Sequence, residues 1–170
     1  MTQKPVSYQD DAEQVISHFS DMVYRLAVSN LHSRCDADDV YQDVFLKYMK
    51  EIKKGKIFDS EEHLKSWLIR VTINCCKSLI TSSWFKKNSE LDENLRDDKN
   101  SFSACGIDMH NALMQLPQKY RSTIHLFYYE QYTTEEIAEI TGEKHSTVRT
   151  QLTRARKMLK EILKGDYPDE

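Results

Sequence analysis

The sequence predicts an all-α protein of two small helical domains joined by a flexible linker. Strand-like alternation of apolar and polar residues is almost absent, and the 170 residues include only four Gly and three Pro, as expected of a chain rich in helices. Apolar residues recur instead at spacings of three and four. A polar segment interrupts this pattern and divides the chain into an N-terminal domain (1–82), a linker (83–108) and a C-terminal domain (109–170).

Two amphipathic helices are expected at the start of the N-terminal domain. Residues 8–32 form the first and residues 37–52 the second, because apolar side chains in both segments recur at helical spacing. The inward face of the second helix is expected to carry Val40, Tyr41, Val44, Tyr48 and Ile52. The opposite face is expected to carry Asp39, Gln42, Asp43, Leu46 and Lys50. This exposed patch is either solvated surface or a docking site for a basic helix of a partner, and composition alone does not decide between them.

A third helix is expected from a cap at Ser60 to about Thr81. Its buried face is expected to carry Leu64, Leu68, Val71, Cys75 and Leu79. A second stripe combines an aromatic ring with cationic and polar side chains: Trp67, Arg70, Asn74, Lys77 and Thr81. Such a stripe suits single-stranded nucleic acid, because bases stack or are captured while the cations hold the phosphates. The alternative is a core tryptophan flanked by surface polar groups, and spacing alone slightly favours this alternative.

The linker is mostly polar between Ser89 and Ser103 and has too few apolar residues to form a core. We therefore expect it to be at least partly mobile. Its acidic run from Glu90 to Asp98 carries the charge needed to mimic DNA and to shield a basic surface of the same chain. Deletion of this run would test that hypothesis.

The C-terminal domain contains the pattern of a helix-turn-helix. Pro117 is placed at the start of the helix that precedes the motif. Thr133 and Glu136 then have the spacing of a capping box. Gly142 is expected to end the short helix, and Ser146 to cap the next one. Two helices joined by such a tight turn are typical of DNA-binding domains.

The second helix of this motif is strongly basic. Its inner stripe carries Val148, Leu152, Ala155, Leu159 and Ile162. The neighbouring stripes carry hydroxyl and cationic side chains: Arg149, Thr150, Thr153, Arg154, Arg156, Lys157 and Lys160. Between residues 144 and 164 the local net charge is +6, although the whole chain has a net charge of −3. This asymmetry favours a helix that enters the major groove of DNA over an ordinary solvated face.

Other classes of protein find no support in the sequence. No apolar run is long enough to span a bilayer and no signal peptide is visible, so we expect a cytoplasmic protein without membrane insertion. The four Cys form no C-x-x-C pair and the six His no ligand cluster, so we expect no metal site and no cofactor. Cys75 falls on an apolar face and is expected to be a buried thiol. The sequence shows no nucleophile–base pair and no Gly-rich phosphate loop, so we expect neither enzymatic activity nor a small-molecule substrate.

These segments together resemble bacterial RNA polymerase sigma factors of the extracytoplasmic-function (ECF) type. In the family's order, and over nearly the whole chain, the matching stretches are DADDVYQDVF, SWLIRVTINCCKSL, ALMQLPQKYRSTIHLFYYEQYTTEEIAEITG and STVRTQLTRARKML. The resemblance implies a region 2 helical bundle, a flexible linker and a region 4 helix-turn-helix. It also implies promoter-specific transcription initiation with core RNA polymerase, no enzymatic activity, and regulation by an anti-sigma factor.

The resemblance further assigns residues to partners. Docking on the beta-prime clamp helices of core polymerase is carried over to Asp39, Gln42, Asp43 and Leu46, and the beta flap is a second polymerase contact of the family. Binding of the -10 element is carried over to Trp67, Arg70, Asn74 and Lys77, and capture of a flipped base to Asn74 with the loop after the helix. Reading of the -35 duplex is carried over to Ser146, Arg149, Thr150, Thr153, Arg154 and Lys157. The chain departs from the family's pattern at Asp43, where many members have Glu, and at SSWFKKN, where many are more basic.

The alternative is a stand-alone helix-turn-helix repressor or activator. Such a protein binds duplex DNA without polymerase, usually as a dimer at a palindrome. It would need neither the acidic face of the second helix nor the aromatic and cationic stripe of the third.

Overall fold

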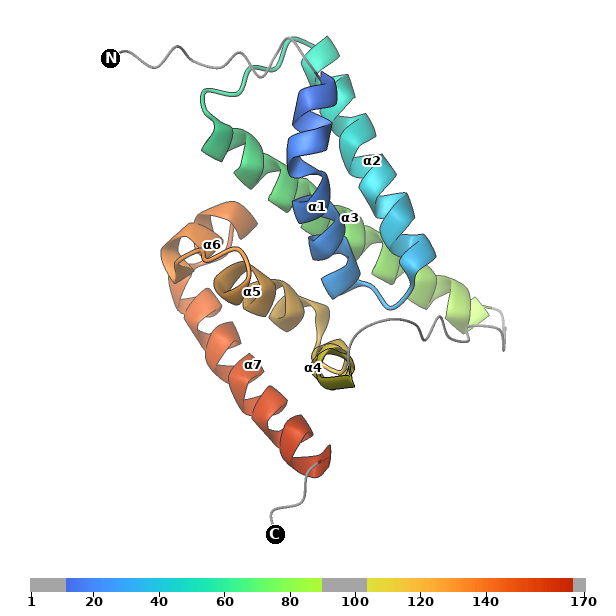
Figure 1. The fold of residues 1–170 in the computed structure, drawn as a ribbon, viewed down its shortest axis with the longest axis vertical. Coiled ribbons are helices and arrows are strands. Elements are labelled where there is room, and N and C mark those ends of the chain that lie inside the picture. Colours follow the sequence, from blue (N-terminus) through green and yellow to red (C-terminus); the bar gives the residue numbers. More distant parts are fainter. Residues whose placement is uncertain (1–11, 90–103, 167–170) are drawn as a thin grey trace.

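The computed structural model describes residues 12–89 and 104–166, and these residues form helices without any strand (Figure 1). The expected all-α class is therefore confirmed. The helices are α1 (Ala12–Asn30), α2 (Arg34–Lys53), α3 (Glu61–Ser89), α4 (Ala104–Met114), α5 (Gln118–Tyr128), α6 (Thr134–Thr141) and α7 (His145–Asp166). The expected start of the first helix, at residues 8–11, lies outside the described residues.

Helices α1, α2 and α3 pack against one another as a three-helix bundle, in the upper part of Figure 1. The Ser33 side chain accepts a hydrogen bond from the Asp36 N–H at 3.4 Å, so α2 begins three residues earlier than predicted. Ser60 caps α3 as expected, because its hydroxyl accepts from the His63 N–H at 3.1 Å. The side chains buried at the centre of this bundle include Val23, Leu26, Val44, Tyr48, Leu64 and Leu68.

Helix α3 extends beyond its predicted end. It was expected to stop near Thr81 but continues to Ser89, because the intervening residues include neither Gly nor Pro to terminate it. Likewise α4 begins at Ala104, before the predicted start of the second domain. The acidic run from Glu90 to Asp98 lies outside the described residues, as does the rest of the segment 90–103.

The helix-turn-helix of the C-terminal domain is formed by α6 and α7. Thr133 and Glu136 form the predicted capping box, with the Thr133 N–H donating to Glu136 Oε2 at 2.8 Å. Gly142 follows α6 in a left-handed conformation, with φ of 73°. The predicted cap of the next helix was wrong: α7 already begins at His145, because the Lys144 carbonyl accepts from the Val148 N–H at 3.1 Å.

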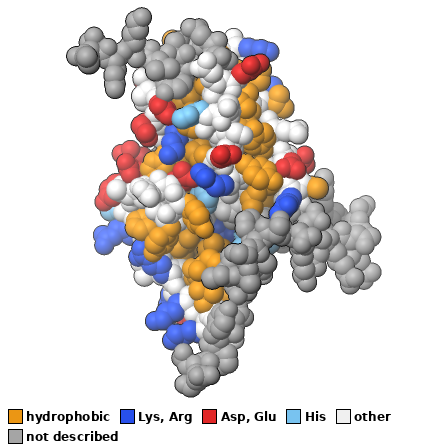
Figure 2. All heavy atoms as spheres, in the orientation of Figure 1, with side chains coloured by type: hydrophobic (Ala, Val, Ile, Leu, Met, Phe, Trp, Pro, Cys, Tyr) orange, Lys and Arg blue, Asp and Glu red, His pale blue; other side chains and the backbone are white. Residues whose placement is uncertain are grey.

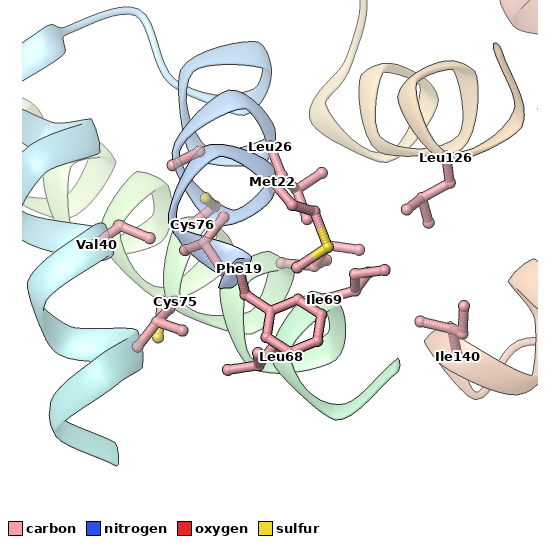
Figure 3. Packing of buried hydrophobic residues seen from close by; sticks show 14 of the residues in the cluster. Phe19, Met22, Leu26, Val40, Leu68, Ile69, Cys75, Cys76, Leu126 and Ile140 are labelled. Atoms are coloured by element: carbon pink, nitrogen blue, oxygen red, sulfur yellow. The ribbon is translucent and has the colours of Figure 1, made fainter. Parts of the chain in front are cut away.

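The two domains pack on each other through α1 and α3 of the first and α4, α5 and α6 of the second. A single cluster of buried apolar residues spans both domains, and in it Leu126 and Ile140 lie across from Met22 and Ile69 (Figure 3). Helix α3 is therefore buried on a second stripe that the sequence pattern did not select: Ile69, Ile73 and Cys76. A prediction from periodicity assumes that each helix buries one face. Here the C-terminal domain covers a second face of α3.

Replacement of Gly142 by Ala should lower the free energy of unfolding by about 1–2 kcal/mol, the cost of a left-handed backbone for an L-residue. The added Cβ would also lie 3.1 Å from Arg70 Nη2, but that end of a flexible side chain can move. Gly165→Ala is the matched control, since Gly165 lies in α7 without a positive φ and with open space at its Cβ. Urea unfolding curves would measure both; equal midpoints for the two variants would contradict the role of the Gly142 backbone.

Candidate nucleic-acid interface

Helix α7 presents one face to solvent and buries the other. The buried stripe includes Val148, Leu152 and Ala155. Every position assigned to -35 reading is exposed: Ser146, Arg149, Thr150, Thr153, Arg154 and Lys157. Figure 2 shows Lys and Arg side chains gathered toward the lower left of the molecule, where α7 lies in Figure 1. The geometry thus leaves a polar and cationic helix face open to a large partner.

Two threonines on this face are fixed by their own helix. The Thr150 hydroxyl donates to the Ser146 carbonyl at 2.9 Å, and the Thr153 hydroxyl donates to the Arg149 carbonyl at 3.0 Å. Each hydroxyl proton is therefore used within the helix, while the oxygen can still accept a hydrogen bond. Such side chains favour partners that offer a donor or an apolar group, such as a thymine methyl.

Arg156 was expected to belong to the basic stripe, but α5 holds it in place. Its Nε donates to the Tyr128 hydroxyl at 2.7 Å, and its guanidinium lies 5.3 Å from the centre of the Phe127 ring. The contacts combine a hydrogen bond with a cation–π interaction. Arg156 therefore links α7 to α5, whereas Arg149, Arg154, Lys157 and Lys160 are other exposed cations of the predicted stripe.

A buried glutamine orients α7 on the rest of the domain. Gln151 accepts from the Thr123 hydroxyl of α5 at 2.9 Å and donates to Glu143 in the turn at 2.7 Å. Sequence analysis did not select Gln151, although its spacing from Val148 and Ala155 places it on the inner stripe. A polar residue at an inner position was the available signal, because buried amides need partners.

The predicted stripe on α3 is divided between core and surface. Trp67 is half-buried and packs against Phe58, with ring centres 5.4 Å apart, while Lys56 Nζ lies 4.9 Å from the Trp67 ring centre. Arg70, Asn74 and Lys77 are exposed. The aromatic member of the stripe is therefore engaged in packing, and the polar members remain accessible.

The outer face of α2 has the predicted exposure. Asp39, Gln42, Asp43 and Leu46 are all exposed, with Leu46 56% accessible. They lie opposite the buried Ala37, Val40, Val44, Phe45 and Tyr48, among which Ala37 and Phe45 were not predicted. Tyr41 and Ile52, which were expected to face inward, are only half-buried. The face combines carboxylates with an exposed leucine, a composition compatible with a basic, partly apolar partner.

Asp43 is held by neighbours from two helices. Lys47 Nζ lies 2.8 Å from its Oδ2, and the Cys75 thiol of α3 donates to the same oxygen at 3.2 Å. The hydrogen bond from Lys47 is the main cause of a lowered Asp43 pKa, although partial burial opposes it. Burial raises the pKa of the Cys75 thiol, so Cys75 is the buried thiol that was expected. Asp43 is consequently ionised at neutral pH and restrained in position.

Other kinds of site are missing from the described ranges. Residues 12–89 and 104–166 contain no group of three His, Cys, Asp or Glu side chains able to hold a metal ion. No helix within them is long and apolar enough to cross a membrane.

Comparisons with known proteins define the class to which this arrangement belongs. Sigma-70 region 2 matches residues 15–85, which extend into α3, and Sigma-70 region 4 matches residues 107–159, which run from α4 into α7. Bacillus subtilis RNA polymerase sigma factor SigV is 32% identical over 144 residues, which cover 81% of each chain. The chain belongs to the sigma-70 family of RNA polymerase sigma factors, in its ECF branch.

Two further relatives agree with this assignment. The ECF RNA polymerase sigma factor SigE of Mycolicibacterium smegmatis is 27% identical over 160 residues, which cover 89% of this chain and 61% of that protein. The sigma factor RpoE of Bartonella quintana, solved in complex with the anti-sigma factor NepR, superposes with a TM-score of 0.74. It is 22% identical and the match covers 89% of this chain and 96% of that one, which shows a shared fold. The protein is therefore a transcription regulator that directs promoter-specific initiation, and the stand-alone repressor is set aside.

The division of the α3 stripe predicts different effects on stability. Trp67→Ala should lower the free energy of unfolding by roughly 2–4 kcal/mol, because it empties a half-buried aromatic site. Asn74→Ala should stay within about 0.5 kcal/mol of the parent, because Asn74 is exposed. Guanidinium unfolding monitored by circular dichroism compares them. A Trp67→Ala protein as stable as the parent would place the indole outside the core.

Proposed function

We propose that the protein joins core RNA polymerase to promoter DNA through three separate surfaces. The outer face of α2 docks on polymerase, the exposed part of the α3 stripe holds the melted -10 strand, and α7 reads the -35 duplex. The observation that carries this proposal is the α7 face, on which all six assigned residues are exposed above a buried apolar stripe. Because each module is small and weak alone, their tethering in one chain makes the second contact effectively intramolecular.

On α7, different side chains have different tasks. Arg149 and Arg154 have the planar donors that suit the O6 and N7 of guanine, and Lys157 suits a phosphate. The restrained Thr150 and Thr153 contribute accepting oxygens and methyl groups. Ser146, near the start of the helix, lies where N–H groups favour a phosphate oxygen.

On α3, hydrogen bonding and charge rather than open stacking support capture of the -10 strand. Asn74 offers an amide to the edge of an unpaired base, while Arg70 and Lys77 offer charges to the phosphates. Trp67 supports this surface from within the core, since its ring packs on Phe58. Flipping a base costs a few kcal/mol, which contacts in a pocket must recover.

Polymerase contacts are proposed at two places. On α2, the carboxylates with Leu46 suit the beta-prime clamp helices, a basic and partly apolar partner. In the C-terminal domain an apolar groove of about 640 Å³ suits a helix of the beta flap. The residues that line it include Leu113, Leu159 and Leu163 from α4 and α7, together with Lys160 and Lys164.

An anti-sigma factor is proposed as the regulatory partner. Support comes from the fold shared with RpoE, which was solved with its anti-sigma factor NepR. A partner that covers Leu46 on α2 or the apolar groove of the C-terminal domain would compete directly with polymerase. Co-purification from uninduced cells should recover such a partner.

Two substitutions separate docking from promoter reading. Asp43→Arg should abolish binding to core polymerase by charge reversal on the α2 face, whereas Arg149→Ala should preserve that binding and lose -35 dependence. Pull-down of core enzyme and transcription in vitro from promoters with and without a -35 element measure the two effects. Asp21→Arg, an exposed carboxylate of α1, is the matched control. The proposal fails if the parent protein directs no promoter-dependent initiation, or if both substitutions weaken core binding equally.

Base contacts and phosphate contacts on α7 should differ in their salt dependence. Arg149→Ala should cost about 1–3 kcal/mol of discrimination at one base pair. Lys157→Ala should weaken binding to all sequences alike and reduce the salt slope by about 1. Holoenzyme titrations on -35 duplexes at several salt concentrations distinguish the two. Identical DNA-sequence preferences for both variants would show that Arg149 contacts the DNA phosphates and not a base.

A further inference from the structure

A pocket of about 410 Å³ lies where α1 meets α4 and α5. Its volume is within the range of small-molecule sites in proteins, and such sites combine apolar walls with a few polar groups. No sequence motif marked this pocket, because its residues come from three separate helices. The basic side chains that line it are Arg25, His110, Arg121 and His125. No Asp or Glu is among its described lining residues, so the pocket is basic on balance.

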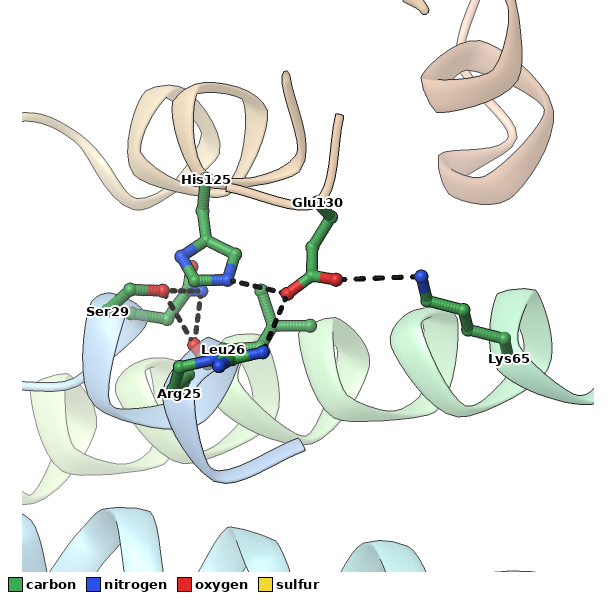
Figure 4. A network of polar contacts seen from close by, with 7 residues as sticks. Arg25, Leu26, Ser29, Lys65, His125 and Glu130 are labelled. Atoms are coloured by element: carbon green, nitrogen blue, oxygen red, sulfur yellow. Dashed lines mark hydrogen bonds and ion pairs between the residues drawn. The ribbon is translucent and has the colours of Figure 1, made fainter. Parts of the chain in front are cut away.

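Glu130 contacts two of these bases from outside the lining (Figure 4). Arg25 Nη2 lies 3.7 Å from its Oε1, and His125 Nε2 lies 3.6 Å from the same oxygen. On its other side, Lys65 Nζ of α3 lies 3.6 Å from Oε2. One carboxylate thus faces three basic side chains already, and it does not balance the charge of Arg121.

Arg121 is a buried cation that the main chain, and no described carboxylate, holds in place. The residue is only 5% exposed. Its Nη2 donates to the Asn30 carbonyl at the end of α1 at 2.6 Å, and its Nη1 donates to the Leu116 carbonyl at 2.5 Å. Its Nε has no hydrogen-bond partner. Burial lowers the pKa of Arg121, and only the buried Cys76 acts in the opposite direction. A buried guanidinium with one unused N–H gains from an anion, because charge-assisted hydrogen bonds are the stronger ones.

The charge of Arg121 also acts on His110, which lines the pocket from α4. Burial, and after it the charge of Arg121, lowers the pKa of His110. A cation disfavours the protonated form of a neighbouring base in this way when no anion between them cancels its field. An anion bound in the pocket would therefore raise the pKa of His110 again.

The remaining surface of the pocket is apolar and aromatic. Tyr129 is 64% exposed, and its ring stacks on His125 with ring centres 5.1 Å apart. Tyr24 of α1 is also exposed. Such rings offer flat contact surface to an apolar ligand. The aliphatic side chains of the walls include Val28, Leu113 and Ile124.

We propose that this pocket binds a small carboxylate with an apolar body, of the size of an aryl-substituted short-chain acid. The carboxylate group lies toward Arg121 and His110, and the apolar body lies against Val28 and Ile124. The volume of about 410 Å³ equals the space of roughly fourteen waters at about 30 Å³ each, which suits a ligand of about a dozen non-hydrogen atoms. The site does not depend on the polymerase and promoter contacts proposed above.

The apolar groove of the C-terminal domain borders this pocket and is a weaker candidate for such a ligand. Leu113 and Ile124 line both. The cations of the groove are exposed: Arg156, Lys160 and Lys164. An exposed cation is already hydrated and gains little from a carboxylate, whereas a buried one gains more. The buried charge of Arg121 therefore places the ligand in the pocket and not in the groove.

The first test compares ligands on the free full-length protein. We expect 4-phenylbutyrate to bind roughly ten-fold or more tightly than 4-phenylbutyramide, which has the same size without the charge, and 4-phenylbutylamine not to bind. In NMR titrations the amide signals of Tyr24, Val28 and His110 should shift. The acid, but not the amide, should raise the pKa of His110. Equal binding of acid and amide, or shifts confined to the signals of Leu159 and Leu163 in the groove, would overturn the proposal.

The second test changes the pocket. Arg121→Gln should bind the acid and the amide alike, whereas Lys119→Gln, which removes an exposed cation of α5 outside the pocket, should keep the difference. Because Arg121 also holds the end of α1, this variant can fail to fold, and circular dichroism would show that. Val28→Phe then provides the decision: it fills the pocket and should abolish binding, while Ile16→Phe, at another half-buried position of α1, should not. Binding of 4-phenylbutyrate to Val28→Phe with the parent's affinity would refute the site.

Discussion

Helix α3 buries two stripes at once, and the arrangement of the chain depends on this constraint. Its adjacent cysteines show the division. The Cys75 thiol points toward α2, where it donates to Asp43, whereas Cys76 is fully buried near Arg121 of the C-terminal domain. Burial raises the pKa of Cys76 to about 12, so this thiol behaves as a small apolar side chain. The helix that we propose to hold the -10 strand is therefore also the support on which the C-terminal domain rests.

Much of the fold could be predicted because local rules governed it. The capping box at Thr133, the left-handed Gly142 and the cap at Ser60 are set by residues within one turn of each other. The exposed faces of α2 and α7 followed from periodicity for the same reason. The predicted cap at Ser146 was wrong. Helix α7 already begins at His145, and its first backbone hydrogen bonds are accepted by the Lys144 carbonyl.

The interface between the domains could not be predicted in the same way. Arg121 and Asn30 are far apart in sequence, and neither has a spacing that marks it as buried. Ile69 and Ile73 lie on a face that becomes inner only when α5 and α6 cover it. Trp67 could be interpreted either as a core residue or as part of a nucleic-acid surface, because spacing cannot show whether Phe58, on the preceding loop, packs against its ring. Contacts between distant segments decide all three cases.

The pairing of Asp43 with Lys47 and Cys75 changes what the proposed docking of polymerase on α2 would involve. A carboxylate that already has a cation at 2.8 Å gains little from a second one, because an incoming basic residue replaces a partner instead of neutralising a bare charge. Such an exchange would be close to neutral in energy, so in the docking that we propose the affinity would come from water released around Leu46. The acidic residues of α2 would then select the partner. An acidic partner would be repelled by them, and a neutral partner would offer no cation to replace Lys47 beside Asp43.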